Sequence, residues 1–196
     1  MKNIFRIIGL GFVTVLLTIS CDLIFGKDNP LTGGGGAYKI GEKGPAGGIV
    51  FYDKGDDNDG WRYLEAAPEE AEFRAMWRVQ GTEVANTQET IGSGRSNTQL
   101  IVETFKHAAG EWDTAAQTAD EMAFNGFDDW FLPSKAELDQ MYGNLKRKNL
   151  GSFKNEWYWS SSIRNDYPRR QSFSDGNMGE GNSTNKYYVR PIRQFK

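Results

Sequence analysis

The chain contains one cysteine, Cys21, and one histidine, His107, among its 196 residues. A single cysteine excludes an internal disulfide, and these two residues are too few for a zinc site built from cysteine and histidine. The fold must therefore be held together by its hydrophobic core. With 6 Trp, 8 Tyr and 12 Phe, the chain has the large side chains that such a core requires. We expect no cofactor, and no nucleophile-elbow motif accompanies His107 to suggest a Ser-His-Asp triad.

The N-terminal segment has the features of a bacterial secretory signal. Lys2 and Arg6 precede an uncharged, mostly apolar stretch over 7–19, which is shorter than the roughly 20 residues of a membrane-spanning helix. A small residue, Ser20, stands directly before Cys21, as in a bacterial lipobox. We therefore predict a signal peptide over 1–20 and a lipid on Cys21. An ordinary secretory signal followed by a free cysteine is the alternative.

The residues after the cysteine predict a tether and one domain. Four consecutive glycines, at 33–36, have no conformational preference and are typical of a flexible linker. The remaining length suits one domain, at roughly 100–200 residues per domain. We predict a lipidated cysteine and flexible tether over 21–37 and a folded domain over 38–196. This organisation predicts a protein of the bacterial cell envelope, anchored by its lipid to the outer membrane or cell surface.

A hairpin is predicted near the start of the domain. β-rich residues at 47–52 and an alternating run at 61–66 flank a polar turn over 56–60. The acidic residues Asp56–Asp59 also allow a calcium site as an alternative. An EF-hand loop with Gly at its sixth position, however, would place Gly55 and Ala66 where its first and last carboxylates belong.

Three helices and several short strands are predicted after the hairpin. Asn97 is expected to cap the first helix and Asp113 the second, whereas the third begins with a capping box from Ser134 to Glu137. Apolar residues at helical spacing continue the first helix; they are Leu100, Ile101, Phe105 and Ala108. β-rich runs follow the third helix; they are 157–161, 171–174 and 187–190. Together these signals predict an α+β fold with an antiparallel sheet.

Six motifs in order along 40–195 resemble the DUF1566 family, also called the Lcl C-terminal domain family. They are IGEKGPAGGIVFY at 40–52, LEAAP at 64–68, GFDDWFLPSKAEL at 126–138, YWSSS at 158–162, SFSDG at 172–176 and YVRPIR at 188–193. The resemblance implies a C-type-lectin-like or formylglycine-generating-enzyme-like fold with short antiparallel strands and two or three helices. The family's namesake is the tip domain of a bacterial collagen-like adhesin that binds sulfated glycosaminoglycans.

The matched motifs imply structural roles more than a ligand site. Trp130, Leu132 and Pro133 are expected to position the third helix, and Trp159 is expected in the core. The catalytic cysteines of formylglycine-generating enzymes have no counterpart, because no cysteine follows residue 21. The sugar and calcium motifs of animal C-type lectins are absent from the sequence as well.

Charge is distributed unevenly along the chain after the signal. Residues 21–130 hold 9 Lys and Arg against 20 Asp and Glu, whereas residues 131–196 hold 12 against 6. A basic face suits an anionic partner, and the planar arginine fork binds sulfate or phosphate oxygens in pairs. We predict a ligand site around a polar loop after Trp159; its residues are Arg164, Arg169, Arg170, Trp157, Tyr167 and Lys186, with Tyr187 as further aromatic surface. In the alternative, the basic part packs on the acidic part, with Arg190 and Arg193 as internal ion-pair partners.

Two classes of function fit these features. The first is a surface-tethered binding module, an adhesin or lectin-like domain for an acidic, sulfated glycan or host matrix. The second is an envelope lipoprotein that is structural or binds a protein and has no glycan ligand. We expect no enzymatic activity, because the carboxylate pairs at 128–129 and 69–70 are sequence neighbours, whereas glycosidase carboxylates face one another. The net charge of −3 and the predicted location argue against a nucleic-acid partner.

Overall fold

The computed structural model describes residues 37–78, 83–84, 87–106 and 113–196, which lie in one compact unit from Gly34 to Lys196. The predicted signal peptide, the predicted lipidation site Cys21 and His107 lie outside the described residues. In the described ranges, no helix is long and apolar enough to cross a membrane.

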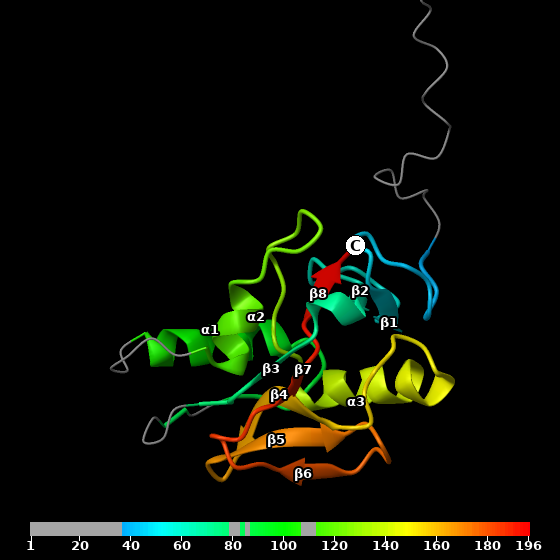
Figure 1. The fold of residues 1–196 in the computed structure, drawn as a ribbon. Coiled ribbons are helices and arrows are strands. Elements are labelled where there is room, and N and C mark those ends of the chain that lie inside the picture. Colours follow the sequence, from blue (N-terminus) through cyan, green and yellow to red (C-terminus); the bar gives the residue numbers. More distant parts are fainter. Residues whose placement is uncertain (1–36, 79–82, 85–86, 107–112) are drawn as a thin grey trace, which may run out of the picture. The chain divides into compact units, whose positions relative to one another are not determined.

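The described strands form two sheets (Figure 1). The smaller sheet has the order β1-β2-β8; these strands are Ile49–Asp53, Tyr63–Ala66 and Ile192–Phe195. The larger sheet has the order β3-β7-β4-β5-β6; these strands are Phe73–Ala75, Tyr187–Val189, Trp157–Arg164, Tyr167–Ser172 and Met178–Glu180. All neighbours pair antiparallel except β4 and β7, which are parallel. The first predicted hairpin is confirmed, because β1 and β2 pair with Ile49 opposite Ala66.

Three α-helices and two 3₁₀ helices complete the described part of the fold. They are α1 (Gly94–Phe105), α2 (Ala115–Asp120), α3 (Lys135–Asn144), η1 (Glu69–Ala71) and η2 (Lys146–Lys148). Helix α3 contacts β4 and β5 of the larger sheet, while α1 contacts β4 and packs on α2 (Figure 1). The predicted α+β class is therefore confirmed.

Neighbouring aromatic residues of β4 join two separate cores. Successive side chains of a strand point to opposite faces. Tyr158 accordingly packs in one core with Leu138 of α3, whereas Trp159 packs in the other with Ile101 of α1. Trp159 is fully buried, as predicted, and its indole N–H donates to the carbonyl of Ala75 at 3.0 Å. The sheet is thus covered by a helix on each face.

The start of α3 confirms the predicted capping box. The backbone N–H of Ser134 donates to Glu137 Oε2 at 2.7 Å, and that of Glu137 donates to Ser134 Oγ at 3.3 Å. The other carboxylate oxygen of Glu137 accepts from the backbone of Gly92 at 2.8 Å. One buried carboxylate therefore joins the helix start to the loop before α1.

The other two predicted caps are wrong. Helix α1 begins after Ser93, and Asn97 lies inside it, buried and hydrogen-bonded to the backbone N–H and C=O of Gln88, both at 2.7 Å. Thr114 rather than Asp113 caps α2, because its hydroxyl accepts from the backbone of the third helical residue. Asn97 has a tertiary role that its position in the sequence does not reveal. Leu100, one of the apolar residues at helical spacing, is 38% exposed, unlike the buried Ile101 and Phe105, and Ala108 lies outside the described residues.

The closing arginines are internal ion-pair partners, as the alternative interpretation held. Arg190 pairs with Glu72 at 2.6 Å, and the two side chains are 1% and 4% exposed. Arg193 pairs with Asp129 at 2.7 Å and with Glu65 at 3.4 Å. These pairs join the last part of the chain to segments more than 60 residues earlier.

Candidate functional site

Five of the predicted ligand residues lie on the β4–β5 hairpin of the larger sheet; they are Trp157, Arg164, Tyr167, Arg169 and Arg170. Strands β4 and β5 meet at Asn165 and Asp166, and Arg164 pairs with Tyr167 across this two-residue turn. Both turn residues have positive φ, 49° and 66°, which is the conformation of a type I′ turn and favours Asn and Asp. The predicted polar loop after Trp159 is therefore wrong, since Arg169 and Arg170 belong to strand β5.

Strand geometry separates Arg169 from Arg170, because neighbouring side chains point to opposite faces. The Arg169 guanidinium lies 3.3 Å from Glu180 Oε1, and its Nε lies 3.8 Å from Glu89 Oε1. Its side chain is only 13% exposed. The charge of Arg169 is thus balanced within the domain, and the structure does not place this residue on the same surface as Arg170.

Arg170 lies between two aromatic rings on the other face of the sheet. Its guanidinium carbon is 4.0 Å from the ring centre of Trp157 and 4.5 Å from that of Tyr187. Its Nε donates to the backbone carbonyl of Glu180 at 3.2 Å, and it has no carboxylate partner among the described residues. Each such cation–π contact contributes about 0.5–2 kcal/mol. The stack of Trp157, Arg170 and Tyr187, called the arginine stack below, therefore holds a positive charge that is not paired with any carboxylate of the described ranges.

Glycines of β6 and the residues after it allow the backbone to approach the stack. A Cβ at Gly181 would lie 2.4 Å from Trp159 Cη2 and 3.0 Å from Arg170 Cδ, whereas a Cβ at Gly179 would lie 3.7 Å from the Trp157 ring. Any side chain at Gly181 would overlap a tryptophan that is fully buried. This close approach helps to fix the position of the Arg170 side chain.

A cleft of about 570 Å³ adjoins the arginine stack at Gly181. It lies between the β4–β5 turn and the segment after β6; its lining is Arg78, Asn165, Asp166, Tyr167, Pro168, Glu180, Gly181, Asn182 and Ser183. Tyr167 is 56% exposed, so its ring is available to a ligand. An exposed aromatic ring beside amide and hydroxyl groups can stack on a sugar ring and hydrogen-bond to its hydroxyls.

Two further predicted cations flank this region. Arg164 is exposed beside Tyr167 at the hairpin end, and Lys186 is exposed directly before Tyr187. Neither forms an ion pair with another residue in the described ranges. The structure therefore brings Trp157 and Arg170 together in the stack and places Tyr167 in the lining of the cleft, whereas Arg164 and Lys186 line neither.

Sequence reasoning missed the residues that close the cleft from distant segments. Arg78 lies about ninety positions before the turn and donates to the carbonyl of Asp166 at 3.0 Å. The carbonyl of Ser183 accepts from the backbone N–H groups of Trp77 and Arg78. Backbone contacts of this kind leave no pattern in a single sequence. The positive-φ turn, in contrast, was signalled by the adjacent Asn and Asp.

Each of the three acidic groups considered above has at least one carboxylate that is bound by a cation. Asp59 and Asp56 lie 3.0 and 3.5 Å from the ammonium of Lys54, and no group of three or more described His, Cys, Asp or Glu residues suits a metal ion. The hydrogen bond from Lys154 lowers the pKa of Glu69 below its ordinary value. In the carboxylate pair at 128–129, Asp129 is bound by Arg193 and Arg95.

Two further carboxylates, those of Glu65 and Glu137, are buried and stabilise the fold. Burial raises the pKa of Glu65 and of Glu137, although backbone N–H donors oppose the shift in both. Glu65 accepts from the N–H groups of Ala46 and Gly48, the latter at 2.7 Å. Both carboxylates are completely buried and fix glycine-containing loops.

The fold defines a mixed α+β domain whose larger sheet carries an arginine–aromatic stack and an adjoining polar cleft. Within this class, the model of the Lcl C-terminal domain family matches residues 69–193. The chain belongs to this family, which confirms the resemblance inferred from the ordered motifs. A comparison with curated proteins gives no significant match.

Proposed function

We propose that this protein is a surface-tethered binding module, of adhesin or lectin-like type, that recognises an acidic, sulfated glycan or host matrix. The observation that carries the proposal is the arginine stack. Arg170 has no carboxylate partner among the described residues, and two rings hold its guanidinium in place. A pre-positioned guanidinium loses little conformational freedom on binding a sulfate or carboxylate group.

The cleft supplies the surface for the rest of such a ligand. Tyr167 offers an exposed ring, and the amide and hydroxyl groups of Asn165 and Ser183 line the same cavity. Two exposed cations are near in the chain: Arg164 pairs with Tyr167 across the turn, and Lys186 directly precedes Tyr187 of the stack. A chain of sugars with anionic groups at intervals would meet aromatic surface and cations in turn. An envelope partner that is a neutral protein would make no use of these cations, so the glycan ranks above the protein-interaction alternative.

The test is binding of the full chain, in neutral detergent, to immobilised heparin across a salt series. Arg170→Gln removes the stacked charge and is expected to weaken binding by about tenfold or more, because a charge-assisted hydrogen bond contributes about 1.5–3 kcal/mol. Arg147→Gln is the matched control, since Arg147 is an exposed cation of η2 outside the site. The wild-type affinity should fall steeply with salt as the charges are screened.

The outcomes distinguish binding at the arginine stack from a general attraction of heparin to the positive charge of the protein. A selective loss in Arg170→Gln, with Arg147→Gln close to wild type, supports the proposal. Equal losses in the two variants would mean that heparin senses only net charge. Absence of heparin binding in the wild type would overturn the sulfated-glycan proposal and favour a protein partner in the envelope.

A further inference from the structure

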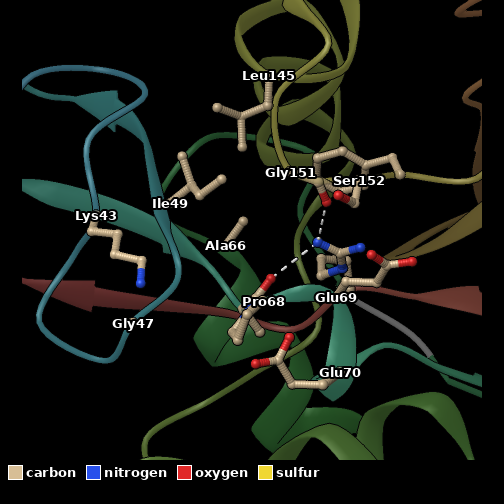
Figure 2. Close-up of a pocket in the computed structure, with 13 residues that line it drawn as sticks. Lys43, Gly47, Ile49, Ala66, Pro68, Glu69, Glu70, Leu145, Gly151 and Ser152 are labelled. Atoms are coloured by element: carbon tan, nitrogen blue, oxygen red, sulfur yellow. Dashed lines mark hydrogen bonds between the residues drawn. The ribbon is translucent and has the colours of Figure 1, made fainter.

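Two cavities of the described part of the fold share no lining residue with the cleft. Figure 2 shows the smaller one, of about 310 Å³, whose apolar walls include Ala66 and Leu145. These two side chains are at most 1% exposed, and the Arg190 guanidinium of the same cavity is held by the carbonyls of Ala67 and Gly151 (dashed lines in Figure 2). A ligand would therefore find little apolar surface there. The larger cavity differs, because its walls are accessible.

The larger cavity is a groove of about 480 Å³ between the β1–β2 hairpin and the residues that lead into α1. We call it the Trp61 groove. The hairpin supplies Tyr52, Lys54, Asp59 and Trp61 to it, and the segment 90–96 supplies the other described lining residues. The two aromatic side chains are half-buried, whereas Asp59 is exposed. Groups from both segments can therefore contact a ligand.

Two aromatic rings give the groove its apolar surface. The ring centres of Tyr52 and Trp61 lie 6.4 Å apart, and the ring planes are inclined by 40°. Both side chains pack against the core that contains Leu138 of α3. Gly92 brings the facing loop close to the indole, because it has a φ of 90° and a Cβ there would lie 3.2 Å from Trp61 Cζ2. The rings are thus positioned before a ligand arrives, which reduces the entropy lost on binding.

Polar groups of the groove are free to hydrogen-bond to a ligand. The indole N–H of Trp61 and the hydroxyls of Tyr52 and Thr90 have no hydrogen-bond partner among the described residues. The Ser96 hydroxyl donates to the carbonyl of Ser93 at 3.0 Å and keeps its lone pairs as acceptors. Thr90 and Ser96 are both exposed. The groove therefore offers donors and acceptors together, the combination that the hydroxyl groups of a ligand require.

The charged groups of the groove neutralise one another. Lys54 Nζ lies 3.0 Å from Asp59 Oδ2 and 3.5 Å from Asp56 Oδ1, and it lies 4.8 Å from the ring centre of Trp61. The Asp59 side chain is 75% exposed, so its other oxygen can accept from a hydroxyl. An anionic ligand would have to displace a carboxylate from Lys54, whereas an uncharged ligand would not. The groove thus differs from the arginine stack, whose charge is unpaired.

We propose that the Trp61 groove binds a neutral sugar, a pyranose unit of an uncharged glycan. The apolar C–H face of the sugar ring lies on Tyr52 and Trp61. The hydroxyls lie around the edge of that face and exchange hydrogen bonds with Thr90, Ser96 and Asp59. The volume of 480 Å³ is within the roughly 300–1,000 Å³ of ligand pockets. This site is separate from the arginine stack, so either proposal can fail without the other.

The test is an NMR titration of the full chain, in a detergent without a sugar headgroup. The probes are the neutral trisaccharides maltotriose, cellotriose and N,N′,N″-triacetylchitotriose. At least one of them is expected to bind with millimolar affinity or better and to shift the indole N–H resonance of Trp61, which is assigned with Trp61→Phe. The affinity should be the same at low and high salt, because binding forms no ion pair that salt could screen.

Conservative variants assign the contacts. Tyr52→Phe and Thr90→Val each remove one hydroxyl and keep the size of the side chain. Each should weaken binding about two- to tenfold, the effect of losing one hydrogen bond. Tyr38→Phe and Thr104→Val are the matched controls, because neither residue lines the groove. Circular dichroism should show all four variants folded as the wild type.

A shift at Trp61 that the two groove variants weaken and the controls leave unchanged supports the proposal. Absence of binding by every trisaccharide would overturn it, as would binding that neither groove variant weakens. A shift at the indole N–H of Trp157 in place of Trp61 would overturn it too, because the sugar would then lie at the arginine stack. A proline-rich peptide is titrated as well, since such peptides dock in aromatic-lined grooves. Tighter binding of the peptide than of any trisaccharide at Trp61 would also contradict the proposal.

Discussion

Replacing Glu72 by glutamine should destabilise the domain strongly, because it leaves a buried guanidinium without its counter-charge. Glu72 Oε2 accepts from Arg190 Nε at 3.0 Å, from Arg190 Nη2 at 2.6 Å and from the hydroxyl of Tyr158 at 2.7 Å. The carboxylate thus holds together the closing motif and β4. Glutamine preserves the size of the side chain but removes the charge and one acceptor oxygen.

The size of the effect follows from burial. The Arg190 side chain is 1% exposed and that of Glu72 is 4% exposed, so water cannot replace the lost partner. Removing one member of a buried ion pair costs about 3–5 kcal/mol. For a domain of this size, about 2–4 °C per kcal/mol converts that loss into a Tm about 6–20 °C lower. Glu70→Gln, two residues away at an exposed position, should change stability by less than about 0.5 kcal/mol.

The assay is urea unfolding followed by tryptophan fluorescence, with a double-mutant cycle. Glu72→Gln, Arg190→Met and the double variant should show non-additive losses, because each single change removes the same interaction. The losses of unfolding free energy in the two single variants should add up to more than the loss in the double variant, by more than about 1 kcal/mol. Additive losses, or a Glu72→Gln variant as stable as Glu70→Gln, would refute the assignment of this pair as a buried structural link.

Two further predictions concern a close backbone contact and a buried phenol. Gly181→Ala should lower the free energy of unfolding by about 1–3 kcal/mol, because its Cβ would overlap Trp159. Gly143→Ala in α3 has open space around the new Cβ and should raise the free energy of unfolding by up to about 1 kcal/mol. Urea unfolding of both variants measures this difference, and equal effects would contradict the packing. Burial, and then the neighbouring Glu72, raise the pKa of Tyr158 well above its ordinary value. The folded state therefore keeps a proton that the unfolded state loses above about pH 10, so this group's contribution is intact below that pH and declines by about 1.36 kcal/mol per pH unit above it. Tyr158→Phe should decline less steeply with pH between about pH 10 and 12, and identical slopes in urea unfolding would contradict the shift.

Local signals in the sequence predicted much of the scaffold. The polar turn between 47–52 and 61–66 gave the first hairpin, and the capping box at Ser134 gave the start of α3. Both depend on residues close together in the chain, so a single sequence contains them. The role of Asn97 could not be predicted in this way. Its amide hydrogen-bonds to the backbone N–H and C=O of Gln88, and only the tertiary structure brings these groups together.

The candidate site shows the same division between local and tertiary information. The residue types were predicted, and Trp157 with Arg170 does form part of an arginine–aromatic stack. The sequence did not distinguish Arg170 from Arg169, since that distinction depends on strand register and on Glu180 and Glu89 beside Arg169. The adjacent Asn165 and Asp166 are a local signal for a type I′ turn, which implies a strand over 167–172 and places the two arginines on opposite faces.

The most direct test of the glycan proposal is an NMR titration of the full chain, in neutral detergent, with a heparin oligosaccharide. The Nε–H resonances of the arginines are observed and assigned with Arg170→Lys and Arg169→Lys. The account predicts that the Arg170 resonance shifts and saturates, together with the indole N–H of Trp157, while the Arg169 resonance stays in place. Equal shifts at Arg169 and Arg170, or shifts confined to residues outside the stack and the cleft, would contradict it.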